Sequence, residues 1–176
     1  MSKIIIEKDK EKIAGLILFF VIQNIISFFM IYFPDFFISK ITRNELFIFI
    51  IGLVLFIMSF LMIISHILLL IDKKKGIVLT DVEIIDHSNY ESLGYIKWED
   101  ITDIKSFKNY SGGYLELTIR NKKEYMKNNI NFLKRILIIM NSWYPNETIN
   151  LNCRRLNCTF KELEDSVFLK WKNRVV

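Results

Sequence analysis

Two uncharged, apolar stretches of this chain decide its fold: residues 13–34, IAGLILFFVIQNIISFFMIYFP, and residues 46–71, LFIFIIGLVLFIMSFLMIISHILLLI. Each is longer than the roughly 20 residues that a helix needs to cross about 30 Å of hydrocarbon. The first exceeds the apolar region of a signal peptide, roughly 7–15 residues, and ends in Phe33-Pro34 rather than in a small-residue cleavage site. We therefore predict that residues 1–75 form a hairpin of two retained transmembrane helices.

Basic residues are distributed unevenly around this hairpin. Only Lys40 and Arg43 lie in the connection between the spans, whereas the outer flanks carry Lys3, Lys8, Lys10, Lys12, Lys73, Lys74 and Lys75. Because segments that stay in the cytoplasm are rich in Lys and Arg, both termini are predicted to be cytoplasmic. Most of the net charge of +5 lies here, beside anionic lipid headgroups. Residues 76–176 carry 15 basic and 13 acidic side chains, which is too balanced to predict nucleic-acid binding.

Polar side chains interrupt the apolar spans at a few positions. Gln23 and Asn24 lie near the middle of the first span, and Ser59 lies at a similar depth if the helices run antiparallel. An interhelical hydrogen bond in hydrocarbon is worth roughly 0.6–2 kcal/mol. These residues either hold the hairpin together or form a polar seam for another membrane protein or an ion. His66 is also counted among the polar contacts of the hairpin, and it lies nearer the cytoplasmic end, where snorkelling or a water contact costs little.

The sequence after the second span changes to short alternating segments. They predict strands at 76–80, 82–86, 93–98, 101–107, 114–119 and 148–152, a basic amphipathic helix at 122–142, and a last helix that opens with a Thr159/Glu162 capping box. The predicted core residues are Trp98, Ile101, Leu117, Leu163 and Trp171. A small bent antiparallel sheet or barrel closed by the last helix would bury this pattern, so the predicted fold class is an α+β membrane protein.

No group of residues predicts catalysis or a cofactor. His87 is the single histidine of residues 76–176, and Glu99 and Asp100 are expected to lie in a solvated turn after Trp98. Cys153 and Cys158 are predicted in a reducing compartment, which argues against a disulfide, and a metal site would need further ligands. We therefore expect neither an enzyme nor a metal protein.

One further charged feature is a set of basic side chains after the second span. Its members are Lys73, Lys74, Lys75, Lys127, Lys134, Arg135, Arg154 and Arg155. Those on the amphipathic helix suit either a membrane surface or a protein partner, and the pattern leaves both open.

Several short segments carry a family resemblance. They are Arg43-Asn44, residues 72–77 (DKKKGI), residues 92–101 (SLGYIKWEDI), Tyr125 and residues 160–163 (FKEL). Together they resemble a family of small uncharacterised bacterial proteins with two transmembrane helices and a cytoplasmic PH-like domain. The resemblance implies a PH-like barrel or bent sheet over residues 76–176, and Glu83 stands where a turn glycine is expected. The first two predicted strands, residues 76–86, carry Asp81, Glu83 and Asp86, and these acidic side chains argue against a phosphoinositide site.

These observations lead to two functional expectations. The first is a membrane-anchored interaction protein of the bacterial cytoplasmic membrane, without enzyme activity, that serves as an immunity protein against a membrane-acting or cytoplasmic toxin. Related two-span PH-like proteins that protect bacteriocin producers support this role. The second is a stress or antiviral effector whose domain senses a ligand and whose hairpin oligomerises and perturbs the membrane. The expected partners are membrane lipids, a toxin or another membrane protein, and further copies of the chain.

Overall fold

The computed structural model describes residues 3–39, 44–90, 92–108, 113–127, 132–140 and 148–172. The chain divides into two compact units, a helix pair (Glu11–Asp72) and an α+β domain (Met1–Lys10 with Lys73–Val176). The domain thus includes residues from both ends of the chain, whereas the sequence pattern assigns everything before Gly76 to the hairpin.

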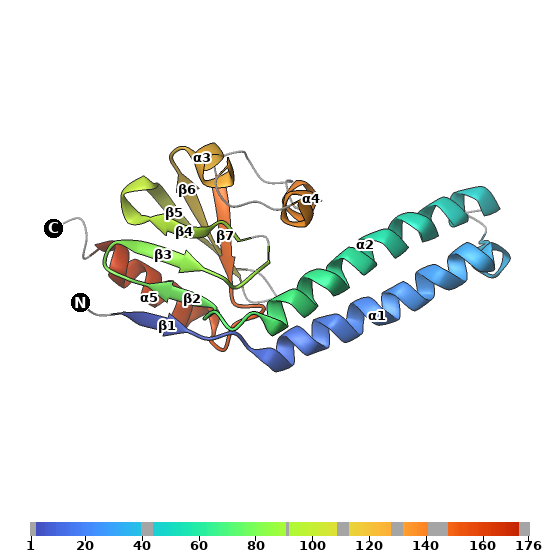
Figure 1. Cartoon of the computed structure of the whole chain (residues 1–176), viewed down its shortest axis with the longest axis horizontal. Helices are drawn as coiled ribbons and strands as arrows, with labels where there is room; N and C mark the ends of the chain where they lie inside the picture. Colours follow the sequence, from blue (N-terminus) through green and yellow to red (C-terminus); the bar gives the residue numbers. More distant parts are fainter. Residues whose placement is uncertain are drawn as a thin grey trace. The chain divides into compact units, whose positions relative to one another are not determined.

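The helix pair consists of α1 (Lys10–Tyr32) and α2 (Glu45–Ile71) (Figure 1). At 1.5 Å per residue they are about 35 and 40 Å long, so both are long and apolar enough to cross a membrane. Pro34 follows α1 and begins a short 3₁₀ turn, η1 (Pro34–Phe37), because proline suits the first position of a helix and not its interior. Asn44 caps α2 through its Oδ1, which accepts the Leu46 N–H at 3.0 Å.

A strand that the sequence pattern does not predict precedes the hairpin. Strand β1 (Ile4–Ile6) pairs antiparallel with β2 (Ile77–Leu79), with Ile6 opposite Ile77. The helix pair is therefore an insertion between two neighbouring strands of one sheet. Three β-branched residues have high strand propensity, but so short a run beside charged residues gives no periodicity from which to predict a strand.

The domain contains two antiparallel sheets and no closed barrel among the described residues. The first has the order β1-β2-β3-β4, with β3 (Glu83–Asp86) and β4 (Gly94–Lys97). The second has the order β5-β6-β7, with β5 (Ile101–Phe107), β6 (Tyr114–Ile119) and β7 (Thr148–Asn152). A 3₁₀ turn, η2 (Trp98–Asp100), separates the sheets, because it takes the chain out of the extended conformation between β4 and β5.

The predicted amphipathic helix is divided between α3 (Lys122–Lys127) and α4 (Phe132–Met140), and the predicted residues between and after them lie outside the described part. Helix α5 (Phe160–Lys172) begins after the predicted capping box, in which the Thr159 N–H donates to Glu162 Oε2 at 2.7 Å and the Glu162 N–H donates to Thr159 Oγ1 at 3.3 Å.

Both sheets and α5 contribute to one hydrophobic core. The alternation of β6 places Leu115, Leu117 and Ile119 inside. Of the predicted core residues, Trp98, Ile101, Leu117 and Leu163 are buried, and Trp171 is partly buried against the same cluster. Burial of this apolar surface is the main stabilising contribution to the domain.

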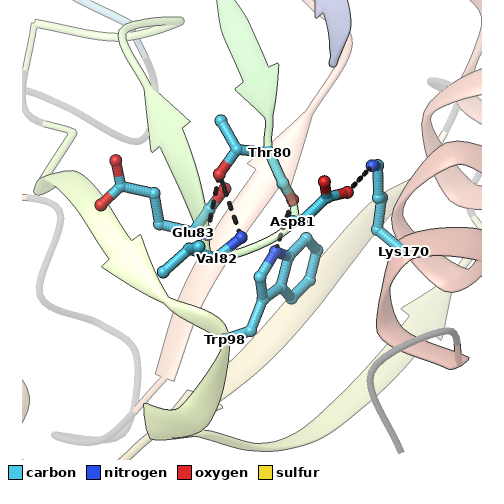
Figure 2. A network of polar contacts seen from close by, with 6 residues as sticks. All are labelled: Thr80, Asp81, Val82, Glu83, Trp98 and Lys170. Atoms are coloured by element: carbon cyan, nitrogen blue, oxygen red, sulfur yellow. Dashed lines mark hydrogen bonds and ion pairs between the residues drawn. The ribbon is translucent and has the colours of Figure 1, made fainter. Parts of the chain in front are cut away.

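The turn between β2 and β3 is closed by Thr80 (Figure 2). Its Oγ1 accepts the N–H groups of Val82 and Glu83, at 3.2 and 2.9 Å, and its own N–H donates to the Glu83 carbonyl. This side chain makes a turn that does not need a left-handed residue, which explains why Glu83 is accommodated where a glycine is expected.

The same turn is connected to η2 and α5 (Figure 2). The Trp98 indole N–H donates to the Thr80 carbonyl at 2.9 Å, and the Lys170 ammonium donates to Asp81 Oδ1 at 2.5 Å. Lys170 is buried although it lies on a helix of mixed polarity. These polar contacts fix the last helix against the first sheet.

Candidate functional site

Two of the three polar residues predicted near the middle of the spans, Asn24 and Ser59, contact each other. Asn24 Nδ2 donates to Ser59 Oγ at 2.8 Å and to the Phe56 carbonyl at 3.1 Å, so partly buried hydrogen bonds join α1 and α2. Gln23 lies beside Asn24 but not in this contact: within the described residues its side chain has no hydrogen-bond partner, and its carbonyl accepts the Ser27 hydroxyl at 2.8 Å.

Gly52 permits a close approach of the two helices. A Cβ built at Gly52 would lie 2.8 Å from the Met30 Cβ and 3.2 Å from the Ser27 carbonyl oxygen. Both Ser27 and Gly52 are buried. Small residues at helix contacts in membranes allow this kind of packing, so a side chain at position 52 would push the helices apart.

His66 is buried in the helix pair, where it makes local polar contacts. Its side chain is 2% exposed, and its ring lies 5.3 Å from the Phe20 ring of α1. The Nδ1 atom lies 2.8 Å from the Met62 carbonyl and 3.2 Å from Ser65 Oγ. The residue turns inward because these local acceptors and the opposite aromatic ring satisfy it more directly than water at a helix end.

The predicted basic residues differ in exposure and in their partners. Lys75 forms an ion pair with Glu7, and Arg155 Nη1 donates to Asn89 Oδ1, so both have structural partners. Lys73, Lys74, Arg135 and Arg154 are exposed and Lys134 is partly buried, whereas the Lys127 side chain lies outside the described part of the structure.

A hollow of about 260 Å³ lies where β4, η2 and α3 meet. It is lined by Leu93, Tyr95, Lys97, Asp100, Asn121, Glu124 and Tyr125. Tyr125 connects two other lining residues: its hydroxyl donates to Asp100 Oδ2, and it also accepts the Lys97 N–H at 3.4 Å. The hollow is thus built from segments that are distant in the sequence.

Two aromatic rings form walls of this hollow. The Tyr95 and Tyr125 ring centroids are 6.4 Å apart, with an interplanar angle of 71°. Tyr95 is 45% exposed, so its ring is open to a ligand. Burial, followed by the hydrogen bond to the Asp100 carboxylate, raises the pKa of Tyr125 to about 12. The hydroxyl therefore stays protonated at neutral pH and keeps donating to Asp100.

Sequence reasoning places Asp100 in a solvated turn and finds in Tyr125 only a marker of the family resemblance. The structure joins them, because the turn η2 directs Asp100 toward the first turn of α3. Asn121, just before α3, has a φ of 57°, a left-handed conformation that asparagine adopts more readily than most residues. A carboxylate near a tyrosine is too common a pattern in sequence to have predicted this site.

Comparisons with models of protein families, with curated proteins and with solved structures found no match to this chain.

Proposed function

We propose that this chain is a non-enzymatic interaction protein, anchored in the bacterial cytoplasmic membrane, whose PH-like domain binds a protein partner on the cytoplasmic side. The observation that carries the proposal is the insertion of the helix pair between β1 and β2. Two antiparallel meanders followed by a closing C-terminal helix support the PH-like assignment.

The pairing of β1 with β2 constrains the membrane topology. β1 precedes α1 and β2 follows α2, and the two strands share hydrogen bonds from Ile4 to Ile6. The hairpin must therefore begin and end on the same side of any membrane that it crosses. The flanking lysines favour the cytoplasm for that side.

Within this class we favour an immunity role, in which the protein intercepts a toxin at or in the membrane. Only residues 33–44 connect α1 to α2, which leaves little chain outside the bilayer for recognition. Recognition is therefore assigned to the bilayer or to the cytoplasmic domain.

Expression in a sensitive strain tests this role. The protein is produced in bacteria that are exposed to the toxin encoded beside its own gene, and survival is compared with that of cells carrying the empty vector. Protection is the expected result. The matched control is a Gly52→Val chain, which keeps the domain but disturbs helix packing, and it should protect less. Full sensitivity of cells that contain the intact chain in their membranes would contradict the immunity role.

A second role as a membrane-perturbing effector is favoured by Gln23. Its amide lies within an apolar helix and, among the described residues, has no side-chain hydrogen bond. Polar groups in hydrocarbon gain from a partner, which a second copy of the chain would supply. Overexpression of the wild-type chain would then be toxic and Gln23→Leu would relieve the toxicity, whereas equal growth of both strains would exclude this role.

A further inference from the structure

The hollow between β4, η2 and α3 has the charge of a cation site. Asp100 and Glu124 both line it, and within the described residues neither carboxylate has a cationic partner. The Asp100 carboxylate accepts the Tyr125 hydroxyl, and its backbone carbonyl accepts the Arg120 N–H at 2.8 Å. Two carboxylates on one hollow repel an anion and attract a positive group.

Among the described residues, two lysines lie at or near the hollow, Lys97 in its lining and Lys122 beside it, and each has another partner. Lys97 Nζ lies 3.3 Å from Glu99 Oε1, and both side chains are more than half exposed. Lys122 Nζ donates to the Thr148 carbonyl at 2.6 Å, and burial lowers the pKa of its ammonium group. Neither of these two ammonium groups is bound to Asp100 or Glu124, so within the described side chains both carboxylates are available to a ligand.

The two tyrosines, Tyr95 and Tyr125, favour one class of cationic ligand, a guanidinium group. Aromatic rings attract cations through their faces, and a guanidinium group both stacks on a ring and binds carboxylates through paired N–H groups. The two rings stand at 71° to each other beside the carboxylates. The volume of about 260 Å³ is below the roughly 300–1,000 Å³ of small-molecule sites and suits a single long side chain.

From these observations we infer that the hollow of Tyr95, Asp100, Glu124 and Tyr125 receives a basic side chain, by preference arginine, of a protein partner. This inference rests on the proposed function and specifies its contact: a polypeptide that presents arginine at the cytoplasmic face. The aromatic walls orient the side chain and the carboxylates bind its charge.

Binding can be measured on the full chain in lipid nanodiscs that contain 3-fluorotyrosine. The probes are three short peptides, Gly-Gly-X-Gly-Gly, in which X is arginine, lysine or citrulline, the uncharged counterpart of arginine. Fluorine NMR is expected to show saturable shifts of the Tyr95 and Tyr125 signals with the arginine peptide, smaller shifts with lysine and none with citrulline. Equal shifts with arginine and citrulline, or no shift with arginine, would overturn the inference.

Variants test whether the carboxylates are responsible. Asp100→Asn and Glu124→Gln should each weaken arginine-peptide binding about two- to fivefold, the range for partly exposed ion pairs. Asp165→Asn removes the same charge from an exposed position of α5 and should leave binding unchanged. Equal weakening by Asp165→Asn would show a general charge effect and overturn the site.

Two further comparisons separate this inference from its alternatives. If the tyrosine signals respond to phosphatidylethanolamine in the nanodisc and not to the peptide, the ligand is a lipid amine and the protein-partner assignment is wrong.

The protection assay compares the wild-type chain with an Asp100→Asn/Glu124→Gln chain. If both chains protect equally, the hollow is rejected as the binding site and the proposed function is retained. Peptide binding without protection would retain the hollow and reject the immunity role.

Discussion

Asp81 and Lys170 form an ion pair whose two members differ in exposure. The Lys170 side chain is 5% exposed and that of Asp81 is 44% exposed. Removal of one partner from a buried pair is strongly unfavourable when the other charge stays buried. Asp81→Asn should therefore lower the free energy of unfolding more than Lys170→Met, which removes the buried charge and keeps an apolar stem. Urea unfolding in detergent measures both variants, and a larger loss in Lys170→Met would contradict this account.

The pH dependence of this pair has a definite sign. The hydrogen bond from Lys170 holds the pKa of the Asp81 carboxyl below its ordinary value of about 4. The contribution of the pair is present above that ordinary value and is lost as the pH falls through the folded-state pKa. The stability difference between wild type and Asp81→Asn should therefore shrink in acid, and unfolding curves at pH 7 and below pH 4 test this expectation.

Tyr125 should affect stability at the opposite end of the pH scale. Its folded-state pKa of about 12 lies above the unfolded value of about 10. The contribution is complete below pH 10 and is lost as the pH rises toward 12, because the unfolded chain releases the proton more readily. Absorbance near 295 nm should show a late-titrating tyrosine that is absent from Tyr125→Phe. If the titrations of the two proteins differ only by one ordinary tyrosine, the hydrogen bond to Asp100 is not formed.

At the scale of the elements, the helix pair offers a matched test of its packing. Gly52→Val places a side chain against Met30 and Ser27, whereas Gly15→Val meets nothing within 4 Å. We expect Gly52→Val to lower stability by about 1–3 kcal/mol, as overpacking does, and Gly15→Val to have little effect. Thermal unfolding followed by circular dichroism and the NMR signals of the Asn24 side-chain amide report the change. Similar behaviour of the two variants would show that the helices do not pack at Gly52.

At the scale of the whole molecule, the edge strand of the first sheet, β1, consists of residues that precede the hairpin. Ile6 is 8% exposed and belongs to the core, whereas its neighbour Ile5 is 46% exposed. Ile6→Ala should cost about 2–5 kcal/mol, the usual range for a buried isoleucine, and Ile5→Ala much less. Hydrogen exchange at the backbone of β2 should accelerate in Ile6→Ala. Unchanged exchange there would mean that β1 is not part of the folded sheet.

Gly76 lies close to residues from both ends of the chain, Ile6 and Leu156. A Cβ at this position, one residue before β2, would clash with the Leu156 side chain and lie 2.8 Å from the Ile6 carbonyl oxygen, so a larger residue does not fit there. The Gly76 carbonyl also accepts the His87 N–H at 2.7 Å. The backbone just before β2 thus packs against residues from three other parts of the chain: Ile6, His87 and Leu156.

The sequence by itself determined the elements with a strong period. The two apolar stretches, the alternation of residues 114–119 and the Thr159/Glu162 capping box each depend on interactions between neighbouring residues, so they can be read locally. The tertiary structure alone decided that Ile4–Ile6 joins the sheet, that the sheet divides at Trp98–Asp100, that His66 turns inward and that Tyr125 meets Asp100. These features depend on long-range pairing and on competition for buried hydrogen-bond partners, which no local pattern records.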